Sequence, residues 1–260
     1  MRTNSLGQIC QNHVDACHDL INRPKGKNWV LPLEDIMPSL PHLHTPEGYV
    51  FEAVYTENPS RCLSDNSIPY IRPAGLHPLN EFQWYRWSKN IPDGYYSPLE
   101  KMVGDCVPEA AWEAVLLDDL DRRLPMFQHA CYCLITYITD LDEYMDTAWI
   151  SRYVDKETGQ PLEVRDVPVK ELPFDHWKTP VFGYKSYDDI REAQKYLNDD
   201  SILPKAIRIT DRTFEVEYCY WGNWSGLMKK RKKVRIEKDS IIIKELSCEN
   251  LVKFDWGVRF

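Results

Sequence analysis

The chain has 260 residues, of which 43% are hydrophobic and 28% charged, an ordinary composition for a soluble globular protein. These values exclude a disordered chain, a collagen, a coiled coil and a multi-span membrane protein. The formal net charge is −8, but residues 201–260 contain 13 Lys and Arg against 8 Asp and Glu, so the first 200 residues are strongly acidic. Such a bipolar chain is atypical of general nucleic-acid binders and favours association between unlike surfaces.

The N-terminal residues carry no apolar core of the kind found in secretory signals. No run approaches the roughly 18 apolar residues that a membrane-spanning helix needs. We therefore expect a soluble protein of a reducing compartment such as the cytoplasm, or a particle assembled there. The eight cysteines are then expected to be free, buried thiols rather than disulfides.

The first 107 residues combine one helix with an unusual proline-rich stretch. Twelve of the 18 prolines lie between Pro24 and Pro108, and each removes a backbone donor and disfavours helix. The same stretch is rich in aromatic residues, which disordered proline-rich chains lack. We predict an ordered, extended arm here rather than a disordered linker. The predicted parts are a helix at 5–22 within a segment 1–23, the arm at 24–107, and short strands in it at 49–55 and 82–87.

The rest of the chain predicts a helical body followed by a sheet. Pro108 suits the first position of a helix, and apolar residues then recur at every third or fourth position. Near the C-terminus, Phe214–Tyr220 alternates apolar and polar residues, as a half-buried strand does. We expect an α+β fold with a small helical body over 108–200 and an antiparallel β-meander over 201–260, as separate segments or one fused domain. The predicted helices span 108–124, 126–150 and 186–197, and the predicted strands 206–209, 213–221, 232–237, 240–246 and 251–256.

Two groups of carboxylates on the predicted central helices are candidates for a metal site. Clustered acids on antiparallel helices hold Mg²⁺ in phosphoryl-transfer enzymes, and the spacing Glu143-x-x-Asp146 places two carboxylates on one helix face. The same acids also fit solvated faces opposite the apolar stripes. A metal-dependent phosphohydrolase is therefore an alternative function. Its candidate ligands are Asp118, Asp119, Asp142, Glu143 and Asp146.

A second metal hypothesis comes from Cys10, His13 and Cys17, which share one face of the predicted N-terminal helix. Thiolates and imidazoles are the ligands that zinc prefers. Three ligands from one helix suit a tetrahedral ion poorly, however, and buried cysteines with surface histidines fit the pattern as well. The sequence contains no nucleophile elbow, Walker loop, dinucleotide-binding glycine motif or HExxH pattern. We assign no catalytic residue and expect no cofactor.

The most basic stretch of the chain runs from Met228 to Arg235, close to Trp221 and Trp224. Cations beside aromatic rings suit phosphates and unpaired bases, and they equally suit an acidic protein surface such as the first 200 residues supply. A solvated edge strand that lysines protect from aggregation is a third interpretation. Nucleic-acid or inhibitor-type binding through this basic hairpin is thus a second alternative function.

The aromatic arm, the segregated charge and the missing catalytic motifs favour a non-enzymatic structural or assembly subunit of a larger complex. Small bodies with a β element and wrapping arms occur in the rings and connectors of bacteriophage-like particles, an analogy of architecture alone. The expected partners are other protein subunits in a homo- or hetero-oligomer, with nucleic acid as an option at the basic stretch and no membrane. The residues predicted to bind partners are Phe82, Trp84, Tyr85, Trp87, Tyr95, Tyr96, Trp221, Trp224, Lys229, Lys230, Arg231, Lys232, Lys233, Arg235, Trp256 and Phe260.

Overall fold

The structure is a computed structural model that describes residues 5–22, 30–54, 68–79, 92–120, 135–155, 157–162, 184, 187–223 and 225–254. Its helices and helical turns are α1 (Ser5–Asn22), η1 (Leu33–Ser39), α3 (Pro98–Lys101), α4 (Pro108–Asp118), α5 (Leu141–Thr147), η4 (Ile150–Arg152), α6 (Tyr187–Gln194) and η7 (Asp200–Ile202). Its strands are β1 (Val30–Pro32), β2 (Leu43–His44), β3 (Tyr49–Val54), β4 (Ile68–Pro73), β5 (Val103–Gly104), β6 (Ile135–Tyr137), β7 (Lys205–Thr210), β8 (Thr213–Gly222), β9 (Gly226–Ile236) and β10 (Ile241–Val252). The predicted α+β class is confirmed.

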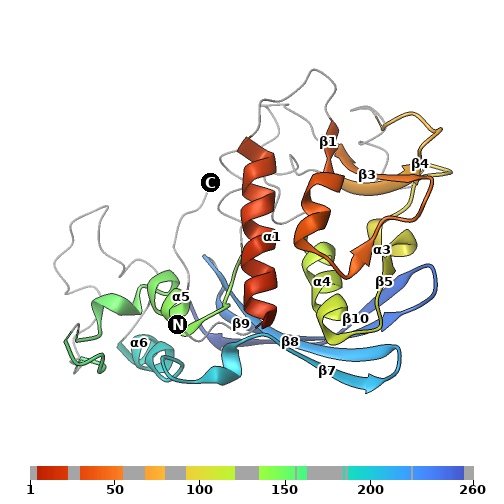
Figure 1. Cartoon of the computed structure of the whole chain (residues 1–260). Helices are drawn as coiled ribbons and strands as arrows, with labels where there is room; N and C mark the ends of the chain where they lie inside the picture. The colour runs from red at the N-terminus through yellow and green to blue at the C-terminus, as the bar shows by residue number, and fades with distance from the viewer. Residues whose placement is uncertain are drawn as a thin grey trace.

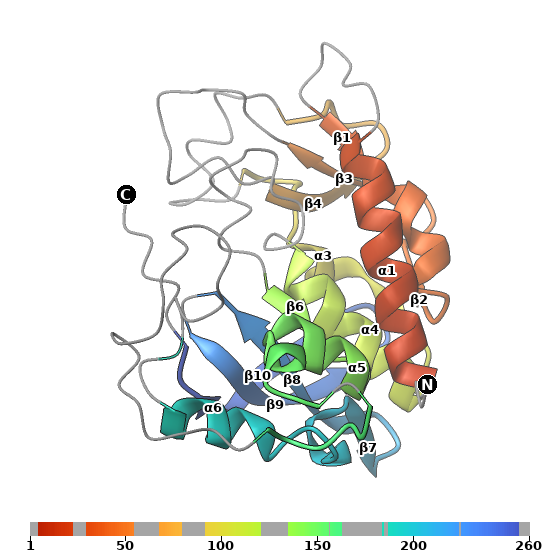
Figure 2. The same ribbon diagram turned by 90° about the vertical axis from the view of Figure 1, so that its left-hand side faces the viewer.

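Helices separate the two larger sheets of the molecule. The large antiparallel sheet has the order β10-β9-β8-β6, and β7 also pairs with β8. A smaller sheet has the order β1-β3-β4, and β2 pairs with β5. Figure 1 shows α1 beside α4, running from the large sheet toward the small one. Both views place α5 and α6 together at one end of the large sheet (Figure 2).

The two faces of the large sheet are covered differently. The predicted alternation on β8 is confirmed, because Phe214 and Val216 are buried toward α4 while Glu215 and Glu217 are only half-buried on the opposite side. We call the side that faces α4 the core face and the other side the outer face. At one end of the outer face, Trp221 and its neighbours pack beneath α5 and α6 in a second core cluster. The rest of the outer face carries charged side chains together with the exposed Ile207 and Ile242.

The described part of the predicted arm packs into the same core as the helices. Leu33, Ile36, Leu40 and Phe51 are fully buried in the cluster that also contains residues of α1, α4 and the large sheet. The predicted strand at 49–55 is confirmed as β3, whereas the one at 82–87 lies outside the described residues. These arm residues therefore pack on the helices and the large sheet of their own chain, while Val54, Tyr70, Leu79 and Tyr95 form a small cluster within the arm.

The continuous helix predicted at 126–150 is wrong at residues 135–140, whereas residues 141–147 are helical as predicted. Residues 135–137 form β6, which pairs with β8 so that Tyr137 lies opposite Tyr220. A separate helix, α5, starts after Asp140, whose side chain accepts a hydrogen bond from the backbone N–H of Glu143 at 2.7 Å. This capping contact begins a new helix where the apolar spacing had predicted a continuous one. Residues 121–134 lie outside the described residues.

The remaining predicted elements agree with the structure except at the C-terminal end. The helix predicted at 5–22 is confirmed as α1. The helix predicted at 186–197 is confirmed as α6 as far as Gln194, and the helix at 108–124 as far as Asp118. The fifth strand predicted at 251–256 is wrong, because Leu251 and Val252 belong to β10 and the fifth strand of the sheet is β6. Among the described residues, no helix has the length and apolar character needed to cross a membrane.

Candidate functional site

The two predicted acidic groups lie in different places and have different partners. Asp118 and Asp119 at the end of α4 face β9, where Nζ of Lys232 donates to Oδ2 of Asp118 at 2.7 Å and lies 3.4 Å from Oδ1 of Asp119. Glu143 instead closes the first turn of α5, because its Oε2 accepts from the backbone N–H of Thr139 at 3.0 Å. Within the described ranges, no three His, Cys, Asp or Glu side chains are grouped so that they could hold a metal ion.

Asp119 is the centre of a buried polar cluster between α4 and the core face of the sheet. Its Oδ2 accepts hydrogen bonds from the hydroxyls of Tyr137 at 2.6 Å and Tyr218 at 3.1 Å. Burial alone would raise the pKa of Asp119, but the Lys232 ammonium and these hydroxyls outweigh it and hold the pKa below its ordinary value. The rings of Tyr137 and Tyr218 also pack against Trp112 at 5.6 and 5.4 Å. The cluster therefore joins α4, β6, β8 and β9.

The cysteine–histidine group on α1 packs against η1. His13 is fully buried, with Nε2 3.6 Å from Sγ of Cys17 and Nδ1 3.1 Å from Oγ of Ser39. The Ser39 hydroxyl donates to the carbonyl of Ile36 at 2.6 Å, so the contact continues into the backbone of η1. Cys10 is also fully buried. The three predicted ligands thus lie in the core, with His13 linking α1 to η1.

The basic stretch forms the middle of β9, which is an interior strand between β8 and β10. The interpretation as an edge strand is therefore wrong. Lys230 and Lys232 point to the core face, in phase with the buried Val234 and Ile236. The other basic residues of the stretch lie on the outer face, and they are Lys229, Arg231, Lys233 and Arg235.

Carboxylates of neighbouring strands neutralise most of this basic stretch. On the outer face, Lys229 pairs with Glu217 at 2.8 Å and Arg231 with Glu215 at 2.9 Å. On the core face, Nζ of Lys230 lies 3.1 Å from a carboxylate oxygen of the half-exposed Glu245 on β10. Lys233 is exposed and lies in register opposite Glu215. A surface on which cations and anions alternate attracts a phosphate backbone less than an unpaired basic patch does.

The described aromatic residues that were predicted to bind partners lie largely inside the molecule. Trp221 is 2% exposed, and its ring lies 4.9 Å from that of Phe254. Tyr95 is 8% exposed, and Tyr96 packs edge-on against Tyr49 at 6.3 Å. The buried rings of Trp221 and Tyr95 are not available to a partner in this structure. The predicted aromatic contacts outside the described residues are Phe82, Trp84, Tyr85, Trp87, Trp224, Trp256 and Phe260.

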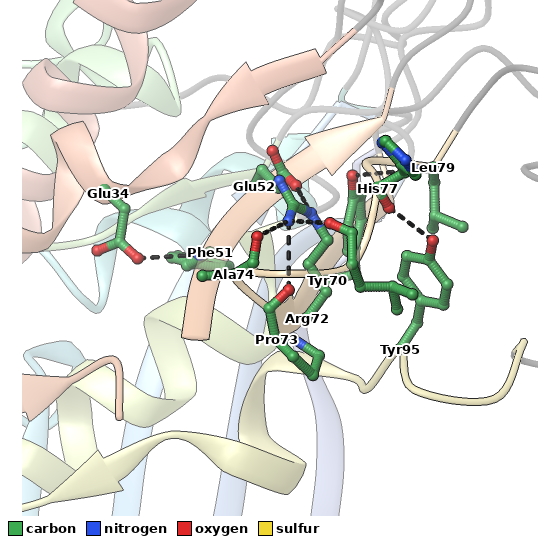
Figure 3. A network of polar contacts seen from close by, with 11 residues as sticks. Glu34, Phe51, Glu52, Tyr70, Arg72, Pro73, Ala74, His77, Leu79 and Tyr95 are labelled. Atoms are coloured by element: carbon green, nitrogen blue, oxygen red, sulfur yellow. Dashed lines mark hydrogen bonds and ion pairs between the residues drawn. The ribbon is translucent and has the colours of Figure 1, made fainter. Parts of the chain in front are cut away.

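A buried ion pair that the sequence analysis missed organises the small sheet (Figure 3). Nε of Arg72 on β4 donates to Oε1 of Glu52 on β3, and both residues are buried. The hydroxyl of Tyr95 donates to the carbonyl of His77 at 2.6 Å. This bond ties residues 92–96 to the segment that follows β4. Nη1 of Arg72 donates to three carbonyl oxygens of the turn after β4, those of Pro73, Ala74 and Leu76. The network clamps that turn onto the sheet.

A second missed pair joins the turn just before β2 to α4. Glu113 is fully buried, and its two oxygens lie 2.6 Å from Nδ1 and 2.9 Å from the backbone nitrogen of His42. Burial raises the pKa of Glu113, although the hydrogen bonds with His42 partly oppose this effect. The imidazole is one-third exposed, so the carboxylate fixes the orientation of a ring at the surface. A lone Glu and a lone His 71 residues apart give no local sequence signal for this contact.

The two edges of the large sheet carry most of the exposed large apolar side chains of the described residues. Ile207 and Ile209 on β7 are 59% and 51% exposed, and Ile242 and Leu246 on β10 are 46% and 41% exposed. Among the described strands, β7 pairs only with β8 and β10 only with β9. Exposed strand edges with apolar side chains are templates for the addition of another strand. The two sheet edges are therefore the candidate protein-binding site.

A comparison with known proteins gives no match. No family model fits the sequence, and neither a curated protein nor a solved structure is significantly similar to it. Function is therefore inferred from the residues and geometry of this chain.

Proposed function

We propose that this protein is a non-enzymatic structural subunit, in which β7 of one copy pairs with β10 of the next copy. The observation that carries the proposal is the concentration of exposed isoleucine and leucine on these two edge strands. Monomeric proteins usually protect such edges with charges, bulges or a covering element. Bulges occur in both strands here, but the apolar side chains beside them stay exposed.

The charges of the two sheet edges support pairing of β7 with β10 rather than with itself. β7 carries Lys205 and Arg208, and Arg208 donates to the carbonyls of Cys106 and Asp211, contacts that leave its positive charge in place. The exposed part of β10 carries one lysine, Lys244, against Glu249 and the half-exposed Glu245, which also pairs with Lys230. Unlike charges favour the association of these strands, whereas two copies of β7 would repel each other.

The positions of the edges determine the kind of assembly. β7 and β10 lie at opposite edges of the same sheet. Pairing of β7 in one copy with β10 in the next copy is therefore a head-to-tail contact. Head-to-tail contacts produce a closed ring when the rotation between copies closes, and a filament when it does not. A ring or connector of a particle, such as a bacteriophage-like one, is an assembly of this kind.

Both alternative functions have less support. A phosphohydrolase would need its acids together, but Asp118 and Asp119 bind Lys232 while Glu143 caps α5. Nucleic-acid binding would need free cations, but most of the basic stretch of β9 is paired with carboxylates.

The first test is native mass spectrometry of the full chain and of two double variants, each blocked at one edge. Ile207→Lys with Ile209→Lys blocks β7, and Ile242→Lys with Leu246→Lys blocks β10. We expect the unmodified protein to form oligomers and each double variant to be monomeric. A mixture of the two variants should form a dimer and nothing larger, because each variant keeps one intact edge.

A matched control adds the same two charges to the exposed face of α1, as Gln8→Lys with Gln11→Lys, and it should assemble like the unmodified protein. A monomeric unmodified protein at micromolar concentration would overturn the proposal. Oligomers that persist in both edge variants, with unchanged melting temperatures, would also overturn it.

A further inference from the structure

A groove of about 1150 Å³ lies between α5, residues 151–155 and 157–162, and Leu197 and Asn198, which follow α6. Its lining shares Leu141, Met145, Val154 and Leu197 with the second core cluster and the apolar residues packed against it. Figure 2 shows α5 and α6, the helices over that cluster. Leu162 is 44% exposed in this groove and is the one exposed large apolar residue, among those described, that lies on neither sheet edge. The apolar side chains that line the groove are Leu141, Met145, Val154, Leu162 and Leu197.

The rim of the groove is acidic. Four carboxylates, those of Asp142, Asp146, Asp155 and Glu157, line it together with one guanidinium, that of Arg152. Oδ1 of Asp155 accepts from the backbone N–H groups of Thr158 at 2.9 Å and Glu157 at 2.8 Å, and these bonds hold the pKa of Asp155 below its ordinary value. The negative charge of Asp155 is therefore retained at neutral pH and below.

Two of these acids repel each other, which lowers the stability of α5. Asp142 and Asp146 are four residues apart on α5, where like charges repel and destabilise an isolated helix. Both side chains are exposed at the groove rather than paired in the core. A cationic partner would turn this repulsion into attraction.

We propose that this groove docks an extended segment of another protein, in which apolar side chains are flanked by lysine or arginine. The groove exceeds the usual size of small-molecule sites, and its apolar floor with an acidic rim matches apolar anchors with basic flanks. The basic stretch of β9 in a second copy does not fit this role, because it is an interior strand with paired side chains. The groove is separate from the two sheet edges, so the inference goes beyond the assembly proposal.

The test measures fluorescence anisotropy of a labelled peptide, GKRLLKRG, titrated with the full-length protein. We expect saturable binding that weakens as the salt concentration rises, and no binding of the acidic counterpart GEELLEEG. Asp142→Asn with Asp146→Asn should weaken binding by about tenfold or more. The matched control, Asp188→Asn with Asp189→Asn, removes the same charge from the first turn of α6 outside the groove and should bind as the unmodified protein does.

A second variant separates docking in the groove from general electrostatic attraction. Leu162→Asp removes an apolar contact but adds a negative charge, so docking predicts weaker binding whereas attraction alone predicts tighter binding. Tighter binding by Leu162→Asp, or equal binding by the Asp142→Asn, Asp146→Asn variant, would overturn the proposal. Spermidine is a further competitor of the labelled peptide. If it displaces the peptide equally well from the unmodified protein and from Leu162→Asp, the groove is a site for small cations, and the proposal is overturned. Assembly by native mass spectrometry should be the same in all these variants.

Discussion

Asp119 combines a buried charge with three hydrogen-bonding partners from three different strands. Asp119→Asn keeps the size of the side chain but leaves the buried Lys232 with Asp118 as its remaining carboxylate. Removing one partner of a buried pair is strongly destabilising, and the remaining pair moderates the loss. We expect the free energy of unfolding to fall by about 2–3 kcal/mol at pH 7, measured by urea denaturation.

The pH dependence of this loss follows from the lowered pKa of Asp119. A carboxyl group whose pKa is lower in the folded state stabilises the protein above its ordinary value of 3.8, and this contribution is lost as the pH falls through the lowered value. The difference between the unmodified protein and Asp119→Asn should therefore shrink in strong acid. The partly exposed Asp118→Asn is the control and should cost less. Equal losses of the free energy of unfolding in Asp119→Asn and Asp118→Asn at all pH values would contradict the role of Asp119 as the buried partner of Lys232.

Local patterns in the sequence carry part of the information about these side chains. Lys230 and Lys232 are in phase with Val234 and Ile236, so the alternation that predicts a strand also indicates that two lysines face the core. Their partners could not be predicted in the same way. Asp118 lies 114 residues before Lys232, and no local pattern connects the two positions.

At the scale of secondary structure, the C-terminal strands were predictable because alternation along β8 and β9 is a local property. The stretch before α5 was not, because Ile135 and Ile138 fit a helical spacing as well as a strand followed by a turn. Pairing of β6 with the distant β8 decides between these alternatives, and that contact is set by tertiary structure.

Gly226 tests how tightly the strands fit at the β8–β9 turn. Its φ is +77°, and a Cβ there would lie 2.0 Å from the carbonyl oxygen of Val252 on β10. We expect Gly226→Ala to lower the free energy of unfolding by about 3 kcal/mol or more, through backbone strain and this clash. Gly48 is the control, because its φ is +79° but no atom lies within 4 Å of a Cβ. Gly48→Ala should cost about 1 kcal/mol in the same denaturation experiment, and equal costs would contradict the clash.

At the scale of the whole molecule, the described part of the arm is a component of the core. Eight residues between positions 28 and 98 belong to the main core cluster, and they are Leu31, Leu33, Ile36, Leu40, Leu43, Phe51, Ala53 and Ile71. Deleting residues 28–98 should therefore unfold the chain rather than release a helical body. Buried side chains of this kind contribute about 1.5–3 kcal/mol each, so their combined loss exceeds the stability of an ordinary domain.

Circular dichroism and limited proteolysis of the deletion variant measure this outcome. Loss of the helical signal and rapid digestion are expected. Phe51→Ala is a milder probe of the same packing and should cost about 3–5 kcal/mol, because the side chain is fully buried. A deletion variant that keeps the helical signal and resists proteolysis would show that the body folds without the arm.

The hydrogen bond from Nε1 of Trp112 to the carbonyl of Leu6 joins residues that are 106 positions apart, and it has a consequence for biosynthesis. A ribosome adds about 5–20 residues per second, so α1 emerges some 5–20 seconds before α4 can cover it. Strands β7 to β10 of the sheet that completes this core come later still, from the last third of the chain. Until α4 emerges, the apolar face of α1, with Leu6, Cys10 and Leu20, can pack on η1 but lacks the native surfaces of α4 and the large sheet. Nascent chains of this protein should therefore bind chaperones through their first helix until the C-terminal strands have been made.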